Sequence, residues 1–198
     1  MRLWIAIGVL LVGGVAFVMH ERKSALENHL GVVATELGHR HVHVHCQSFA
    51  GNLVDVSNEA GYVKFDASGV PLDYMVLKRP ICQALARYPK DVRSSAYACV
   101  LQNAQCSQRI LYDMWAVHTL AHEDWHLHGI GNEALTECNA MQTTAQAAEL
   151  FGADAQSAQA TATYLWTHMY GEEPDEYRTP ECANGGPDDL RPADPVWP

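Results

Sequence analysis

Near its N-terminus the chain carries an uninterrupted apolar stretch, which limits how many folded units can follow it. Residues 3–19 have no charge and no strong hydrogen-bonding side chain. As a helix they would span about 26 Å, close to the roughly 30 Å hydrocarbon core of a bilayer. We therefore predict a single membrane-spanning anchor at 1–20, with a signal peptide cleaved near Ala16 as the alternative. Roughly 175 residues follow, enough for one core and too few for two comfortable domains.

Charge and cysteine content bear on partners and compartment. The net charge is -10, from 23 acidic and 13 basic residues, without a basic stripe. A nucleic-acid partner is therefore disfavoured. The six cysteines all follow the apolar stretch, and none has CxxC or zinc-ribbon spacing. Such a set indicates disulfide bonds outside the cytoplasm. We expect a single-pass protein of the cell membrane with an extracytoplasmic domain, or a secreted protein if the apolar stretch is cleaved.

Hydrophobic periodicity predicts an α+β fold. Residues 21–38 are helix-permissive and are expected to form a helical stalk, followed by one domain at 39–198. Alternation at 39–46 indicates a strand with His41, His43 and His45 on one face. The stretches 61–66 and 70–77, joined by a glycine turn, indicate a hairpin. These strands predict a small antiparallel sheet.

The second half of the chain reads as helical. After a short helix at 80–87, longer helices are expected at 105–127, from just after Gly131 to 151, and at 154–170. The short turn at Gly129–Gly131 makes the first two long helices an antiparallel pair.

The first long helix contains the sequence His-Glu-Asp-Trp-His at 122–126, an HExxH motif. Histidines at i and i+4 lie on one helical face, where both imidazoles can bind one Zn²⁺. Glu123 can then accept a proton from a zinc-activated water. His122 and His126 are therefore predicted zinc ligands and Glu123 a predicted catalytic base. The alternative is a pair of core histidines with ordinary hydrogen bonds.

A catalytic zinc site also needs a third protein ligand and one open position. Glu133 and Glu137 lie four residues apart on the otherwise apolar face of the second helix. In the antiparallel pair, Glu133 falls near His126 and Glu137 near His122. Glu133 and Glu137 are therefore both candidates for the third ligand.

Residues 122–140 resemble the gluzincin class of zinc metallopeptidases, with Asn-Glu-Ala-Leu-Thr-Glu at 132–137 similar to the thermolysin stretch. The resemblance implies that Glu133 is the third ligand and that Glu137 orients a ligand histidine. Glu133 is therefore the preferred ligand and Glu137 the alternative. Asn132 is a more remote candidate, because the turn at Gly129 resembles the HExxHxxG turn of metzincins, which have His or Asp at the position of Asn132. The gluzincin resemblance also implies a Tyr or His that stabilises the transition state, and Tyr177 and His168 are candidates, beside Tyr170 and Arg178. The chain departs from most gluzincins in the short spacing between its second histidine and Glu133.

Most of the chain also resembles uncharacterised bacterial membrane-anchored proteins that have an HExxH helix, a second helix of the ECxA type and a similar tail at 181–190. That resemblance implies no activity.

Two further histidine groups have less specific interpretations. We interpret His118, one turn before the motif, as an ordinary residue of the buried stripe, with support of the metal site as the alternative. The histidines at 41, 43 and 45 are interpreted as exposed strand residues, with a second metal site as the alternative.

The cysteine pairing is argued from locality. Short loops and adjacent elements favour Cys46–Cys82 and Cys99–Cys106, which leaves Cys138–Cys182. The last bond would hold the proline-rich tail, with Tyr177 and Arg178, beside the second helix.

Together these features predict a membrane-anchored zinc metallohydrolase, most simply a peptidase acting on a peptide or protein. A non-catalytic envelope protein with a structural or idle metal site is the alternative, as is a latent enzyme covered by its tail.

Overall fold

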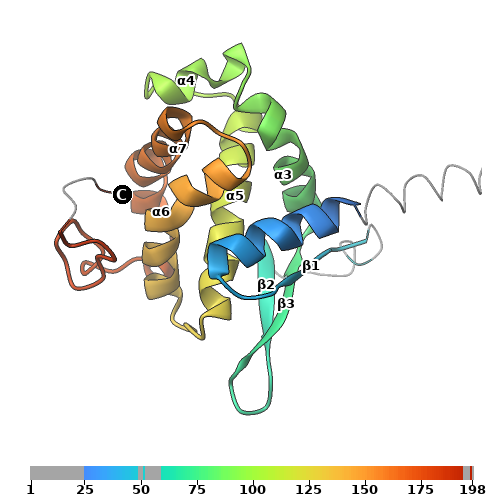
Figure 1. Ribbon diagram of the computed structural model, residues 1–198. Helices are drawn as coiled ribbons and strands as arrows, with labels where there is room; N and C mark the ends of the chain where they lie inside the picture. Colours follow the sequence, from blue (N-terminus) through green and yellow to red (C-terminus); the bar gives the residue numbers. More distant parts are fainter. Residues whose placement is uncertain (1–24, 49–50, 52–58, 194–196, 198) are drawn as a thin grey trace, which may run out of the picture.

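The computed structural model describes residues 25–48, 51, 59–193 and 197 (Figure 1). The predicted anchor at 1–20, like the alternative signal peptide, lies outside these residues. Within the described ranges, none of the helices combines the length and apolar character needed to cross a bilayer.

The α+β class is confirmed, and the sheet is mixed rather than antiparallel. Its strands are β1 (His43–Cys46), β2 (Gly61–Phe65) and β3 (Pro71–Leu77), in the order β1-β3-β2. β2 and β3 form the expected antiparallel hairpin, whereas β1 pairs with β3 in parallel. β1 and β2 therefore lie at opposite edges of the sheet, on either side of β3. Alternation within a strand specifies its two faces but not its neighbour, and so the prediction was wrong here.

The helix over residues 25–38 belongs to the domain and is not a separate stalk. Its side chains at Leu30, Val33, Ala34 and Leu37 are buried in the same core as the sheet and the later helices. It lies across the helical half (Figure 1), where its His29 ring contacts Phe151. Helical periodicity alone could not distinguish an exposed stalk from a helix that buries one face.

Five labelled helices follow the sheet along the described chain. They are α3 (Arg79–Asp91), α4 (Ala98–Leu101), α5 (Gln108–Leu127), α6 (Glu133–Leu150) and α7 (Ala155–His168). Short 3-10 turns occur at Ser95–Tyr97, Tyr170–Glu172 and Asp175–Tyr177, and the last two are η2 and η3.

The boundaries of the three long helices follow from capping residues. Ser107, Asn132 and Asp154 each precede a helix and accept a hydrogen bond from a backbone N–H of its first turn. Gly129 adopts a φ of 83° in the turn after α5, a conformation that glycine tolerates best. The result is the expected antiparallel pair of α5 and α6.

The three predicted disulfide bonds are confirmed. Cys46–Cys82 joins β1 to α3, Cys99–Cys106 closes the short connection before α5, and Cys138–Cys182 joins α6 to the tail. No cysteine in the described chain is free.

Candidate metal centre

α5 places the two motif histidines side by side. The ring centroids of His122 and His126 are 4.8 Å apart, as their i, i+4 spacing requires. Both lie in the last turns of α5, which pack against α6 on one side and approach the sheet on the other. His122 is only 9% exposed. The helix therefore presents two imidazoles to a partly enclosed space.

Glu133, the first residue of α6, supplies a third donor to the same point. Its Oε2 atom lies 3.1 Å from Nε2 of His122 and 3.4 Å from Nε2 of His126. Zinc bonds of about 2.0–2.1 Å place two tetrahedral ligand atoms about 3.3 Å apart. The three donor atoms lie within 4.8 Å of one another. These residues therefore fit a zinc ion. We expected Glu133 beside His126, and it reaches both histidines.

Asn132 has a different role. Its side-chain oxygen accepts a hydrogen bond from the backbone N–H of Leu135, 2.9 Å away, and so caps α6. This cap fixes the start of α6 at Glu133 and thereby places the Glu133 carboxylate opposite α5.

Both histidines are oriented by acceptors on their other ring nitrogen. Nδ1 of His126 donates to the carbonyl oxygen of Ile130 over 2.7 Å, and Nδ1 of His122 donates to Oε2 of Glu137 over 2.8 Å. In the metal-binding tautomer, the Nε2 lone pairs then point to the shared space beside Glu133. Glu137 lies near His122, where the antiparallel pairing placed it.

Glu137 also contacts a third histidine of α5. Its Oε1 atom lies 2.8 Å from Nε2 of His118. Nδ1 of His118 lies 2.9 Å from the hydroxyl of Thr144, which itself donates to the carbonyl oxygen of Ala140. The hydroxyl must accept from Nδ1, so both ring nitrogens of His118 face acceptors. His118 is thus part of the support of His122, and its interpretation as an ordinary stripe residue was wrong.

Glu123 is buried without a hydrogen-bond partner for one of its oxygens. The side chain is 5% exposed, and its Oε2 atom makes no hydrogen bond to the described chain. Burial raises the pKa of Glu123 to about 7, although His122 and His126 lower it. An orphaned buried carboxylate is costly, and one that can hold a proton near neutral pH is suited to proton transfer.

The backbone of β2 makes room for this carboxylate. A Cβ atom placed on Gly61 would lie 2.9 Å from Oε1 of Glu123 and 2.8 Å from Cδ2 of Leu77. Glycine at 61 therefore lets β2 approach α5 closely. This role of Gly61 could not be predicted from the sequence, because the chain does not display which helix packs against this strand.

The charges of the cluster reinforce one another. Burial disfavours the charged form of His122, but hydrogen bonds to Glu133 and Glu137 outweigh it and raise its pKa to about 10. Hydrogen bonds from His122 and His126 lower the pKa of Glu133 to about 2. Without a cation between them, the histidines carry protons that the carboxylates hold in place. The cluster is therefore built to bind positive charge.

The donors lie in a cleft of about 670 Å³. Residues of three segments line it. β2 contributes Gly61, Tyr62 and Val63, α5 lies between the other two segments, and the tail from Glu173 to Tyr177 forms the wall opposite β2. The tail thus lines the cleft. The volume falls in the range typical of sites for small molecules or peptide side chains.

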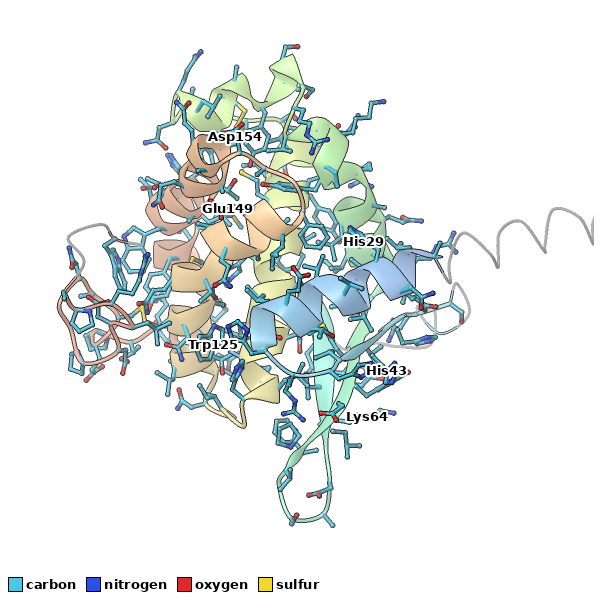
Figure 2. All side chains as sticks on the ribbon, viewed as in Figure 1. His29, His43, Lys64, Trp125, Glu149 and Asp154 are labelled. Carbon is cyan, nitrogen blue, oxygen red and sulfur yellow. A yellow bond between two sulfur atoms is a disulfide. The ribbon has the colours of Figure 1, made fainter. Side chains whose placement is uncertain are left out.

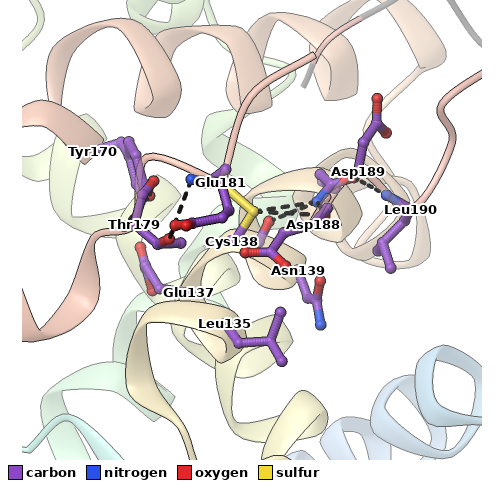
Figure 3. Close-up of a disulfide and its surroundings, with 12 residues drawn as sticks. Leu135, Glu137, Cys138, Asn139, Tyr170, Thr179, Glu181, Asp188, Asp189 and Leu190 are labelled. Atoms are coloured by element: carbon purple, nitrogen blue, oxygen red, sulfur yellow. Dashed lines mark hydrogen bonds between the residues drawn. A yellow bond between two sulfur atoms is a disulfide. The ribbon is translucent and has the colours of Figure 1, made fainter. Parts of the chain in front are cut away.

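The Cys138–Cys182 bond holds this tail beside α6 (Figure 3). The amide of Gln142 on α6 donates to the carbonyl oxygen of Asp188 and accepts from the N–H of Leu190. The tail packs along α6 (Figure 1), and the Tyr177 ring lies 5.9 Å from the ring of His122. Tyr177 therefore lies at the site, as its assignment as a possible transition-state stabiliser requires.

Other predicted residues lie elsewhere. Nε2 of His168 lies 2.8 Å from the side-chain oxygen of Asn103, and His168 does not line the cleft, so that candidate was wrong. Its position at the end of α7 could not be related to the cleft from sequence. Arg178 binds Asp175 and the carbonyl oxygen of Gly171.

The strand histidines are separate from the centre. His43 is exposed on β1, away from the helical half (Figure 2), and His45 pairs with Glu27. Among the described residues, only the cluster of His122, His126 and Glu133 brings three metal-binding side chains together.

Comparison with protein-family models, with curated proteins and with solved structures finds no match for this chain. Its function is therefore argued from the site.

Proposed function

We propose that this chain is a zinc-dependent metallohydrolase, and specifically a peptidase of gluzincin type. One observation carries the proposal: the Nε2 atoms of His122 and His126 and the Oε2 atom of Glu133 converge in a cleft, beside the buried and unpartnered carboxylate of Glu123. A bound zinc ion would supply the Lewis acid that polarises a carbonyl and acidifies a water molecule.

The chain's own residues have separate roles in this proposal. Glu123 accepts a proton from water and later donates it to the leaving amine, which suits a carboxyl with a pKa of about 7. Glu137 and the Ile130 carbonyl hold the two histidines in the tautomer that leaves Nε2 free. The Tyr177 hydroxyl, on the opposite wall, can donate a hydrogen bond to the developing oxyanion.

The number of converging donors favours a hydrolase over a structural site. Structural zinc sites are closed by four protein ligands, whereas catalytic sites keep one position open. Three donors converge in the described chain. A cleft beside them gives a substrate access to the fourth position, which a structural site does not need.

We also propose that the domain works outside the cytoplasm, held at the cell membrane by the apolar stretch at 3–19. Three disulfide bonds support an oxidising compartment. Peptide mapping of the non-reduced protein from its native host tests this, since free thiols at all six positions would contradict it.

The zinc content and activity of three proteins test the function. We expect the wild-type chain to bind about one zinc and to hydrolyse peptides. His126→Ala should lose zinc, and Glu123→Gln should keep zinc and lose hydrolysis, because it removes the base and not a ligand. Elemental analysis and mass spectrometry of a peptide digest give the readouts. Zinc retained in His126→Ala, or equal hydrolysis by Glu123→Gln, would refute the assignment. Zinc bound with four protein donors and without hydrolysis would favour the binding-protein alternative.

A further inference from the structure

The mouth of the cleft carries carboxylates that the zinc site does not use. Glu59 precedes β2, and Glu173 and Glu176 belong to the tail on the opposite wall. No lysine or arginine lines the cleft in the described part of the chain. The mouth therefore presents negative charge from both walls.

The carboxylates deeper in the cleft have histidine partners. Glu133 lies beside His122 and His126, and Glu137 lies beside His118 and His122. A bound zinc ion would add two positive charges there. The three mouth glutamates have no such partners among the described residues. They consequently set the sign of the field that an arriving substrate meets.

The mouth glutamates are also available to form ion pairs with a ligand. Among the described residues, none of Glu59, Glu173 and Glu176 forms an ion pair, since the nearby Arg178 is held by Asp175. Their field reaches the centre of the cleft: burial, together with the charges of Glu133, Glu176 and Glu59, raises the pKa of Tyr177 to about 12.

Aromatic rings stand beside these carboxylates. Tyr62 and Phe65 on β2 and Trp115 on α5 line the same cleft, and Phe65 is 41% exposed. Lysine and arginine pack their apolar stems on such rings, while their charged ends reach carboxylates. The buried, unpartnered carboxylate of Glu123 in the same cleft is a second indication that a ligand completes it.

From this arrangement we propose that the cleft binds cationic peptides, with lysine or arginine next to the bond placed at the zinc centre, and that Glu59, Glu173 and Glu176 select them. The substrate class rests on the proposed peptidase function, whereas binding of the cationic peptide does not require hydrolysis.

Cleavage and binding are measured separately. The full-length chain is given a mixed decapeptide library, and cleavage positions are read by mass spectrometry. Binding is measured by fluorescence anisotropy with the Glu123→Gln chain and two labelled probes, an alanine decapeptide with four lysines and its counterpart with four glutamates. The variant Glu173→Gln/Glu176→Gln removes two mouth charges. Glu149→Gln/Glu172→Gln is the matched control, because it removes two exposed charges that do not line the cleft.

We expect cleavage next to lysine or arginine, and binding of the lysine probe about tenfold tighter than that of the glutamate probe at low salt. The mouth variant should lose most of this preference and the control should keep it. Cleavage without a basic preference, or a preference unchanged in the mouth variant, would overturn the selection. Selective binding without any cleavage would support the cationic cleft and count against the peptidase. Absence of both would refute both proposals.

Discussion

The Oε1 atom of Glu137 lies 2.8 Å from Nε2 of His118, and both side chains are buried. The other oxygen of Glu137 holds His122, so one carboxylate connects a buried histidine to a proposed zinc ligand. Burial opposes the charged form of Glu137, but His118 and His122 lower its pKa to about 2. His118 thus keeps the partner of His122 ionised.

Loss of His118 should therefore weaken zinc binding without removing a ligand. We expect His118→Gln to lower zinc affinity about tenfold and Glu137→Gln about 10–100-fold, whereas Glu133→Ala removes a ligand and should lower it further. Competition with a chelator gives the affinities. His128→Gln is the control, because His128 is exposed at the end of α5 and does not line the cleft. If Glu137→Ala weakens zinc more than Glu133→Ala, Glu137 is the ligand.

Zinc binding should release protons. Hydrogen bonds to Glu133 and Glu137 overcome burial and raise the pKa of metal-free His122 to about 10, and the pKa of His126 is also raised. Both rings therefore hold a second proton below those pKa values and must lose it to bind zinc. Affinity should fall with falling pH, about tenfold per unit for each proton displaced.

Calorimetry in two buffers of different ionisation enthalpy measures the protons released. A buffer-independent enthalpy at pH 7, or an affinity that does not change between pH 8 and 6, would show that the cluster is not protonated as its geometry indicates.

Gly61 gives a test of the space around the base. In Gly61→Ala, the new Cβ would lie 2.9 Å from Oε1 of Glu123 and displace the carboxylate. We expect at least tenfold lower turnover with zinc retained, and a loss of about 1–3 kcal/mol in the free energy of unfolding from overpacking. Gly171→Ala is the control, since Gly171 does not line the cleft and its added Cβ meets no atom within 4 Å beyond its chain neighbours. Equal turnover of the two variants would mean that the Glu123 carboxylate is not held by this contact.

The parts of the site that the sequence predicted are those set by local geometry. The i, i+4 spacing of His122 and His126 and the turn at Gly129 determine which side chains of α5 and α6 meet. Glu133 and Glu137 therefore lie where the helix pairing placed them. The three disulfide bonds also followed from locality.

The parts that the sequence did not predict depend on long-range pairing. The approach of β2 to Glu123, the parallel pairing of β1, and the burial of the helix at 25–38 each join segments whose register the chain does not display. His118 was misjudged for a similar reason. The role of a buried histidine in an apolar stripe depends on its hydrogen-bond partners. One partner of His118 is Thr144 on α6, and the sequence does not show that these two residues meet.

Tyr177 and His168 were equal candidates from sequence, and only one lies at the site. Tyr177→Phe should lower kcat about 10–100-fold and leave zinc affinity unchanged, because it removes a hydrogen-bond donor to the oxyanion and not a ligand. His168→Gln, at the end of α7, should leave kcat unchanged. Steady-state kinetics at saturating zinc gives both values. A fall in substrate affinity alone in Tyr177→Phe would assign the hydroxyl to substrate binding.

The Cys138–Cys182 bond connects stability to the wall of the cleft. It closes a sequence separation of 44 residues, against 7 for Cys99–Cys106. By loop-closure entropy, its removal should lower the free energy of unfolding by about 4 kcal/mol, and removal of the shorter bond by about 2–3 kcal/mol. Cys138→Ala/Cys182→Ala should also release Tyr177 from the cleft, so turnover falls and limited trypsin digestion at Arg178 accelerates. Cys99→Ala/Cys106→Ala controls for general destabilisation, because that loop lies away from the tail. If the Cys138 variant keeps full turnover and a protected Arg178, the contacts of Gln142 hold the tail without the disulfide.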